Sequence, residues 1–187
     1  MLTLFFVEDL PTQVGQIYEF DNDDARHAIR VLRMAAGEKF MLADGTGAWS
    51  QVKAFAVKKK SIEVEVIASG YQDRLPTTIT VVQALTKSDR AKEVIELLTE
   101  AGVDRIVPWA ASRSIGKASD KFSIHAREAS KQSRRLRIPE VTDIATTEQI
   151  CDAIQLSDLA IVFHENAEVK LSDCVRSEER RVGKECW

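Results

Sequence analysis

The segment from Ile79 to Trp109 contains the residues best placed for chemistry. It begins with an apolar, β-rich run, is broken by polar residues at Thr86 to Asp89, and continues with apolar residues at helical spacing before strand character returns after Gly102. This pattern predicts two parallel strands joined by a helix. Ligands of open α/β sheets bind beyond the carboxyl ends of the strands. The polar side chains expected there are Gln83, Lys87, Asp89 and Arg90.

A cationic helix is predicted nearer the N-terminus, from Asp23 to Met34, with Asp21 or Asn22 as its N-cap. Its basic residues fall three or four apart, so they share much of one face. Such a face could neutralise RNA phosphates, although a solvated face balanced by neighbouring acids has the same pattern. The residues concerned are Arg26, His27, Arg30 and Arg33.

Two further basic groups stand out in a chain whose net charge is only −3. Lys58 to Lys60 form a predicted hairpin tip, a position where charge commonly serves only solvation. The run from Lys117 to Arg137 is denser and favours a polyanion partner about as strongly as it favours solvation. Its cations are Lys117, Lys121, Arg127, Lys131, Arg134, Arg135 and Arg137.

Several functions are not supported by the motifs. The three histidines are far apart and no serine lies in a nucleophile elbow, so a hydrolase is a weak interpretation. Neither a dinucleotide-binding nor a P-loop glycine motif occurs. Three cysteines without C-x-x-C spacing argue against a disulfide framework and a zinc site, and no metal site is expected.

Strands separated by turns make up the first part of the chain, where only one short helix is predicted. This pattern indicates a small barrel. The strands are expected at residues 2–7, Gln16–Phe20, Lys39–Ala43, Trp49–Val57 and Ile62–Val66. The period then changes, which places a boundary near residue 72 and divides the chain into residues 1–72, 73–175 and an atypical tail, 176–187.

The second part alternates strand and helix and therefore predicts an α/β domain with a mainly parallel sheet, α+β for the chain as a whole. After Trp109 we expect a loop and then a basic helix that ends before Pro139. The elements expected from there on are the loop Ala111–Ser119, the helix Asp120–Arg135, a short strand Val141–Ala145, a helix from a Thr147 cap to Ile154, and a buried parallel strand Asp158–His164.

Bulk composition is that of a globular protein. The 187 residues are 44% hydrophobic and 29% charged, and no apolar run approaches the roughly 18 residues of a membrane span. Met1 to Phe6 is too short for a signal peptide and has no basic flank. The expected location is the cytoplasm, with no membrane partner.

An ordered set of short motifs occurs along the chain. The motifs are His27-Ala-Ile-Arg-Val-Leu-Arg-Met34 after an acidic cap, Asp44-Gly45, Lys59-Lys60-Ser61, Gln83 with Lys87, Glu100-Ala-Gly-Val103, Arg113-Ser114, and Lys131-Gln-Ser-Arg-Arg-Leu-Arg-Ile-Pro-Glu-Val141. Together they resemble one family, the RsmE 16S ribosomal RNA uridine-N3 methyltransferases of the SPOUT class. The resemblance covers residues 2 to about 170 in order.

The resemblance implies a PUA-like barrel that places RNA, followed by a SPOUT domain whose C-terminal knot binds S-adenosylmethionine, usually in a homodimer. The implied reaction is methylation of N3 of one uridine in small-subunit RNA. Lys87, Arg113, Arg134 and Arg135 would stabilise the uracil anion or hold flanking phosphates. The implied RNA-binding residues are Arg26, His27, Arg30, Arg33, Lys59, Lys60, Gln83 and Lys131.

The chain departs from the family after about Cys174. The family's Gly-Pro-Glu-Gly-Gly and Leu-Gly-x-Arg-x-Leu-Arg segments are absent, and the charged end from Arg176 to Trp187 does not fit the pattern. The hypothesis is a truncated frame joined to foreign sequence, with most of the cofactor pocket lost, activity impaired and the dimer weakened. The remaining cofactor residues would be Phe163, His164 and Glu165. A non-catalytic RNA-binding module and a generic α/β protein with solvating patches are the alternatives.

Overall fold

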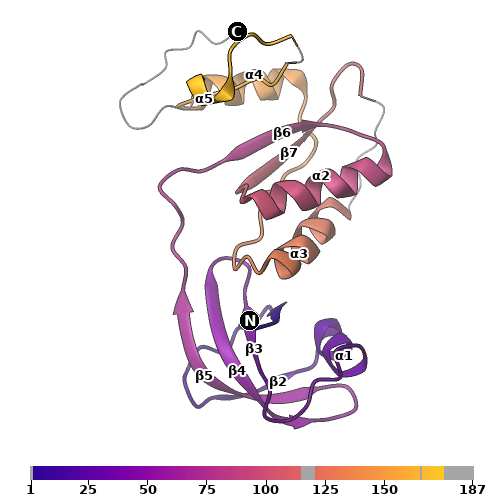
Figure 1. Ribbon diagram of the computed structural model, residues 1–187, viewed down its shortest axis with the longest axis vertical. Coiled ribbons are helices and arrows are strands. Elements are labelled where there is room, and N and C mark those ends of the chain that lie inside the picture. The colour runs from indigo at the N-terminus through magenta and orange to yellow at the C-terminus, as the bar shows by residue number, and fades with distance from the viewer. Residues whose placement is uncertain (1, 115–120, 165, 175–187) are drawn as a thin grey trace.

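Two separate β-sheets organise the molecule, one in each half of the chain (Figure 1). The computed structural model describes residues 2–114, 121–164 and 166–174, with the backbone alone described at Ser88, Asp89 and Cys174. Within these residues no helix is both long and apolar enough to cross a bilayer. The mixed α/β architecture, a curled sheet followed by a parallel one, confirms the predicted fold class.

The first sheet has five strands in the order β1-β3-β4-β5-β2. Register shifts between β4 and β5 at Gln51/Val52 and at Ala54/Ala56 are bulges, which bend a sheet and increase its twist. The sheet therefore curls into a half-barrel. The strands are β1 (Leu4–Phe6), β2 (Ile17–Phe20), β3 (Lys39–Ala43), β4 (Ala48–Val57) and β5 (Ile62–Tyr71). β1 runs parallel to β3, and the other neighbours are antiparallel.

Three phenylalanines fill the centre of the half-barrel. Phe5, Phe20 and Phe40 have ring centroids 5.4–5.8 Å apart in tilted and edge-on pairs. These separations lie in the range where aromatic pairs gain energy beyond their burial. Alternate residues of β4 and β5 complete this core, because successive side chains of a strand point to opposite faces of the sheet.

Helix α1 (Asp23–Arg30) closes one end of the half-barrel and is shorter than the predicted Asp23–Met34. Asn22 is its N-cap and accepts from the Ala25 amide. Past the helix, Arg33 adopts a left-handed backbone with φ of 54°, and Met34 turns back into the core. The helix was predicted correctly, but it stops about one turn early, and Met34 is buried in the core after it.

The second sheet is parallel, in the order β6-β7-β8, with β6 (Thr80–Ala84), β7 (Arg105–Trp109) and β8 (Glu140–Val141). Helices α2 (Ser88–Ala101) and α3 (Lys121–Ser133) pack together against it and share one apolar core. Gly102 ends α2 in the left-handed conformation that glycine tolerates best. The predicted strand-helix-strand unit is confirmed.

Three boundaries in this half differ from prediction. α3 stops at Ser133, not Arg135, because Arg134 takes a left-handed backbone with φ of 57°. The strand expected over Val141–Ala145 is only Glu140–Val141, with a single further bridge from Ala145 to Trp109. Helix α4 (Thr147–Leu156) is capped by Thr146 rather than Thr147, since Thr146 and Gln149 form a reciprocal capping box.

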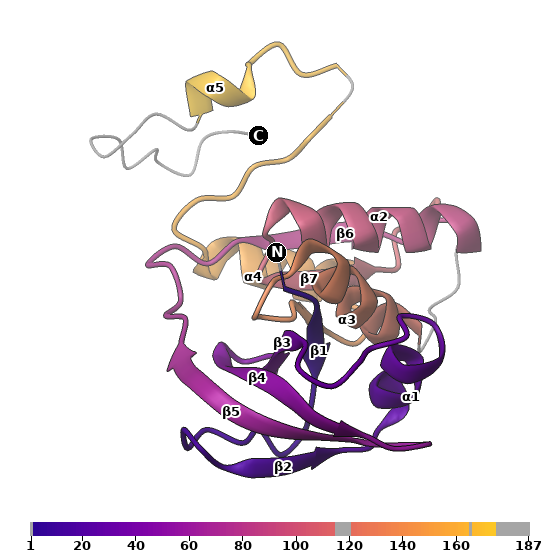
Figure 2. The same cartoon turned by 60° about the horizontal axis from the view of Figure 1, so that its bottom comes forward.

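The expected buried strand Asp158–His164 is wrong. The segment has no strand structure, and Val162 and Phe163 are 62% and 80% exposed. A strand needs a neighbour to complete its hydrogen bonds, and the described residues offer this segment none. Figures 1 and 2 show the chain leaving α4 and running away from both sheets towards the short helix α5 (Leu171–Cys174).

The β3–β4 turn depends on Asp44. Its carboxylate accepts from the Thr46 amide and hydroxyl, both at 2.7 Å, and from the Ala48 amide at 3.2 Å. Burial alone would raise the pKa of Asp44, but these hydrogen bonds outweigh it and hold the pKa below the ordinary value of 3.8. A carboxylate with a lowered folded-state pKa stabilises the protein above its unfolded pKa.

We expect Asp44→Ala to lower the free energy of unfolding by about 1 kcal/mol at neutral pH, because three partly exposed hydrogen bonds are lost. The difference from wild type should shrink as pH falls from 3.8 through the lower folded-state pKa. Urea denaturation at neutral and acidic pH measures both. An Asp44→Ala penalty that grows in acid would contradict the assignment.

Candidate functional site

The carboxyl ends of β6 and β7 bring three predicted site residues to one edge of the sheet. Gln83 lies in β6 opposite Pro108, and its amide donates to the Ala84 carbonyl at 3.0 Å. The exposed Lys87 is the residue at which α2 begins. Arg113 is exposed in the turn after β7, which is closed by Ser114 donating to Ala111. Parallel pairing therefore places Lys87 and Arg113 at the same edge, as the sequence predicts.

The surface at this edge has little depth. A hollow between β6, α2 and Phe122 has a volume of about 10 Å³ and mainly apolar walls. That volume holds about one water molecule. Lys87 and Arg113 therefore present positive charge to solvent rather than into a ligand-sized cavity.

Arg135 lies at the other end of α2. Its Nη1 donates to the carbonyls of Thr99 at 2.7 Å and Val103 at 3.0 Å, both beside the C-terminus of that helix. Burial lowers the pKa of Arg135, and Asp104 opposes that effect. A helix of 14 residues is about 21 Å long, so the structure does not bring Arg135 to Lys87 and Arg113 within one chain. Arg134, just before it, is exposed.

The predicted RNA-binding cations of the barrel come together at one end of it. Phe20 pairs with Ile62, so the β4–β5 hairpin tip lies beside the start of α1, as both ribbon views show. Exposed Lys59 and Lys60 are in that tip. The helix and the loop that follows it supply the remaining cations of this basic end, Arg26, His27, Arg30 and Arg33.

One cation of the basic end, Arg26, and the neighbouring Lys58 of the hairpin tip already form ion pairs. Arg26 forms an ion pair with Asp23 on the first turn of α1. Lys58 bridges Glu63 at 2.7 Å and Glu19 at 3.3 Å. Hydrogen bonds to these two carboxylates raise the pKa of Lys58, while Ser61 and Lys58 lower the pKa of Glu19. Lys59 and Lys60 have no such partners among the described contacts, so the tip keeps net positive charge.

Several cations of the basic run from Lys117 to Arg137 bind groups within the protein. Lys117 lies outside the described residues. Arg127 bonds the Phe6 carbonyl, Lys131 pairs with Asp24, and Arg137 donates to the Gln72 carbonyl. These contacts leave no pattern in the sequence, because the partner groups lie 65 to 121 residues away.

The two predicted cofactor residues that the structure describes are exposed to solvent. Phe163 is 80% exposed, and His164 is exposed with its Nδ1 accepting from the Asn166 amide at 3.1 Å. Glu165 lies outside the described residues. Because residues 158–164 form no strand, they do not pair with the sheet, and Phe163 and His164 are not held against it. The part of the chain that the structure describes also contains no cluster of three metal-ligating side chains.

Comparison with protein families defines the class of protein. Residues 73–184 match the RNA methyltransferase domain, and residues 20–67 match the RNA methyltransferase PUA domain. A PUA half-barrel joined to an RNA methyltransferase domain is therefore the class to which the fold and the basic surfaces belong.

Named relatives narrow the class. The chain is 31% identical over 182 residues to ribosomal RNA small subunit methyltransferase E of Mycobacterium bovis, covering 91% of this chain and 69% of that protein. It is 26% identical to the Bacillus subtilis protein of the same name, covering 89% of this chain and 66% of that one. The chain belongs to the ribosomal RNA small subunit methyltransferase E family.

Solved structures of methyltransferases have a fold similar to that of this chain. The Neisseria gonorrhoeae methyltransferase E bound to S-adenosyl methionine superposes with a TM-score of 0.73 at 26% identity, covering 81% of this chain and 65% of that one. A Legionella pneumophila methyltransferase with bound SAM gives 0.71 at 25% identity, covering 81% and 66%. The chain thus spans about two thirds of the length of these structures.

Proposed function

We propose that this protein acts in the S-adenosylmethionine-dependent methylation of N3 of a uridine in 16S ribosomal RNA. The proposal rests on one observation: this member of the family has two separate basic surfaces. One lies at the end of the half-barrel and the other at the carboxyl ends of β6 and β7. The proposed partner is the small ribosomal subunit, and the proposed location is therefore the cytoplasm.

The barrel's basic end would hold RNA phosphates, which gives affinity without sequence preference. At the sheet edge, Lys87 and Arg113 would stabilise the negative charge that uracil acquires when N3 loses its proton, or would hold a flanking phosphate. The Gln83 amide has both a donor and an acceptor and suits the edge of the base. Arg134 would contact a flanking phosphate, and Arg135 would support α2.

A second candidate function is RNA binding without chemistry. It is favoured by one contrast within the described residues. The RNA-facing cations are assembled at the end of the barrel, whereas Phe163 and His164 are exposed to solvent. On this proposal the 187-residue chain binds structured RNA but methylates it poorly, and any homodimer is weakened.

Calorimetry with S-adenosylmethionine is therefore expected to show no micromolar binding by the 187-residue chain, because the hollow between β6, α2 and Phe122 at the sheet edge has a volume of only about 10 Å³. Small-subunit RNA should still bind, with an affinity that falls steeply as salt rises. Micromolar cofactor binding would contradict the first expectation.

Incubation with labelled cofactor and 16S RNA distinguishes the two functions. Label at N3 of a single uridine supports the enzyme, and salt-dependent binding without label supports the binding module. RNA binding that is absent, or insensitive to salt, would overturn both and favour a generic α/β protein.

A further inference from the structure

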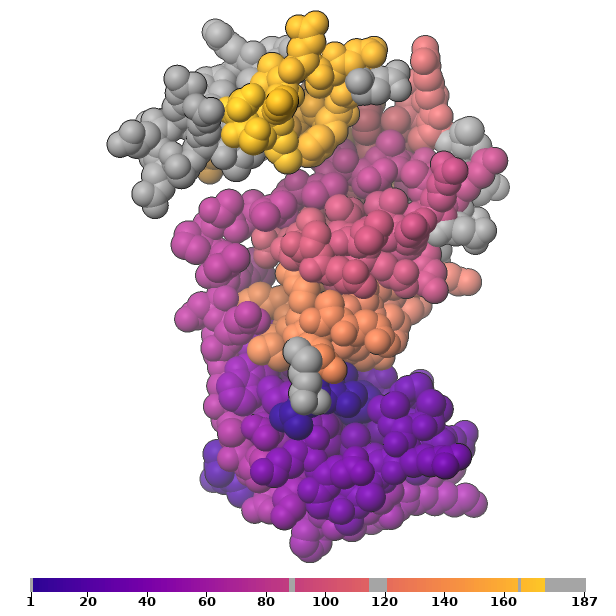
Figure 3. All heavy atoms as spheres, viewed as in Figure 1, coloured from indigo at the N-terminus to yellow at the C-terminus, as the bar shows by residue number. Residues whose placement is uncertain are grey.

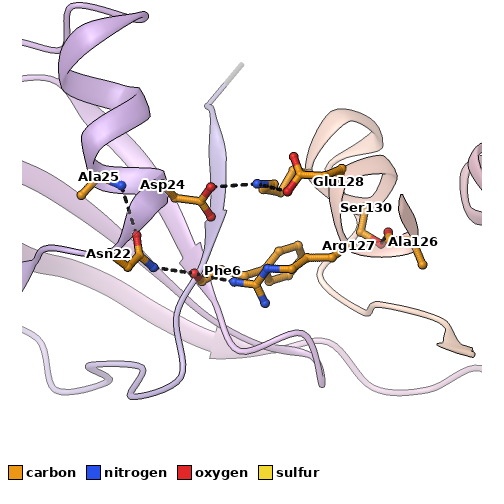
Figure 4. Close-up of polar contacts among 9 residues, drawn as sticks. Phe6, Asn22, Asp24, Ala25, Ala126, Arg127, Glu128 and Ser130 are labelled. Carbon is orange, nitrogen blue, oxygen red and sulfur yellow. Dashed lines mark hydrogen bonds and ion pairs between the residues drawn. The ribbon is translucent and has the colours of Figure 1, made fainter. Parts of the chain in front are cut away.

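Helix α3 is attached to the barrel by two side chains one helical turn apart. Arg127 Nη2 donates to the Phe6 carbonyl at 3.0 Å, and its guanidinium carbon lies 5.1 Å from the centre of the Phe6 ring (Figure 4). Lys131 Nζ lies 2.8 Å from Asp24 Oδ1 and 2.5 Å from Glu128 Oε1. Residues four apart on a helix share a face, so this face of α3 is a contact surface with the barrel.

The Phe6 carbonyl connects three elements. Besides Arg127 it accepts from Asn22 Nδ2 at 3.2 Å, and Asn22 Oδ1 in turn caps α1 by accepting from the Ala25 amide at 3.1 Å. The end of β1, the start of α1 and the middle of α3 therefore meet at one group, as Figure 4 shows. Any rotation of α1 relative to α3 breaks at least one of these hydrogen bonds.

Lys131 is poorly placed to bind RNA. Its side chain is 13% exposed and that of Asp24 is 16% exposed, so the pair is largely removed from water. Taking two charges out of water is costly unless each neutralises the other. With Asp24 and Glu128 both beside the ammonium, a phosphate would have to displace a carboxylate.

We infer that Asp24, Arg127 and Lys131 are positioning residues that fix the orientation of the RNA-binding barrel relative to the methyltransferase domain. We call these three residues the joint. α1 carries Asp24 of the joint on its first turn, and the proposed RNA-binding residues Arg26, His27 and Arg30 follow it on the same helix. The joint therefore sets where RNA held by α1 lies relative to the sheet edge of the second domain.

A second attachment holds the domains together without the joint. Leu136 and Ile138 pack on Leu4, Phe6 and Ala43. The Ile138 amide donates to the Gly45 carbonyl at 2.9 Å, where a side chain on Gly45 would collide with Ile138. Figure 3 shows α3, in orange, seated directly on the barrel. Loss of the joint should therefore loosen the angle between the domains without separating them.

Charge removal at Asp24 tests the inference, because electrostatics and positioning predict opposite signs. Asp24→Asn removes an acid from an RNA-facing helix and frees Lys131, so electrostatics alone predicts tighter RNA binding. If the joint fixes the domain orientation, its loss should weaken RNA binding. The basic end of the barrel and the sheet edge of the second domain would no longer be held at a fixed spacing when both contact the same RNA. We expect Asp24→Asn and Lys131→Met each to weaken binding of a 16S RNA transcript about fivefold to tenfold, and the double variant to weaken it no further.

The matched control is Asp23→Asn, one residue earlier. The Asp23 side chain is 94% exposed and pairs only locally with Arg26. Its loss should leave RNA affinity unchanged or raise it. Tighter binding by Asp24→Asn, or additive losses in the double variant, would make Lys131 an independent RNA contact and overturn the inference.

The RNA measurement rests on the proposed function, so a second one does without RNA. Spin labels on Lys53→Cys in the barrel and on the exposed Cys151 of α4, with Cys174 and Cys186 replaced by serine, report the distance between domains. Asp24→Asn and Lys131→Met should broaden its distribution, and Asp23→Asn should not. Unchanged distributions in the joint variants would overturn the inference even if wild type binds no RNA, whereas broadening without RNA binding would count against the proposed function alone.

Discussion

Phe20→Ala is expected to lower the free energy of unfolding by about 3–5 kcal/mol, because it leaves a cavity at the centre of the half-barrel. Phe20 is fully buried, and its ring lies 5.4 Å from that of Phe5 and 5.8 Å from that of Phe40. Both neighbours are held by β1 and β3, so they cannot collapse into the space. Domains are commonly stable by only about 5–15 kcal/mol, so this loss would leave the barrel close to unfolding.

Urea denaturation measures the loss, with far-UV circular dichroism for the whole chain and with Trp49 fluorescence as a probe in the barrel once Trp109 and Trp187 are replaced by phenylalanine. Phe55→Ala is the matched control, since Phe55 lies in β4 but is 67% exposed. Its cost should stay within about 0.5 kcal/mol. Equal midpoints for Phe20→Ala and Phe55→Ala would show that the three rings are not the centre of the core.

The strands and helices that sequence predicted correctly are those whose own side chains determine their structure. Ile62, Val64 and Val66 alternate with polar residues, and all three are buried in β5. Helix α2 begins and ends where its apolar period and Gly102 indicate. In each case the pattern within the segment is enough, because burial of one face fixes the conformation.

Elements that depend on a distant partner could not be predicted in the same way. The parallel pairing of β1 with β3 leaves no mark on either strand. Residues 158–164 are as apolar as a buried strand, but apolar composition does not supply a neighbouring strand. Arg33, three residues after α1, and Arg134, the residue after α3, adopt left-handed backbones, which arginine rarely adopts and sequence therefore does not indicate.

The candidate site shows the same division for charged residues. Lys87 was placed correctly at the sheet edge because the strand-helix-strand pattern alone puts it there. Lys131 and Arg135 are cations in a basic run, as RNA-binding residues commonly are. In the structure Lys131 pairs with Asp24, and Arg135 donates to backbone carbonyls. A cation that binds an internal acceptor and one that binds phosphate are indistinguishable in sequence.

Arg135→Met is expected to lower the free energy of unfolding by about 2–3 kcal/mol, the range for charge-assisted hydrogen bonds whose partners remain partly buried. Its guanidinium bonds the Thr99 and Val103 carbonyls, and Thr99 is fully buried. The cation also lies at the C-terminus of α2, where the helix dipole favours positive charge. Methionine keeps most of the stem packing, so the loss reports the hydrogen bonds and the charge.

Arg113→Met separates support of the fold from contact with RNA. Arg113 is exposed in the turn after β7, so its loss should leave stability within about 0.5 kcal/mol while weakening RNA binding and lowering its salt dependence by about one phosphate contact. Arg135→Met should do the reverse, lowering the denaturation midpoint while leaving the salt dependence unchanged. If instead Arg135→Met is as stable as Arg113→Met and binds RNA with a smaller salt dependence, Arg135 contacts the substrate and the support of α2 lies elsewhere.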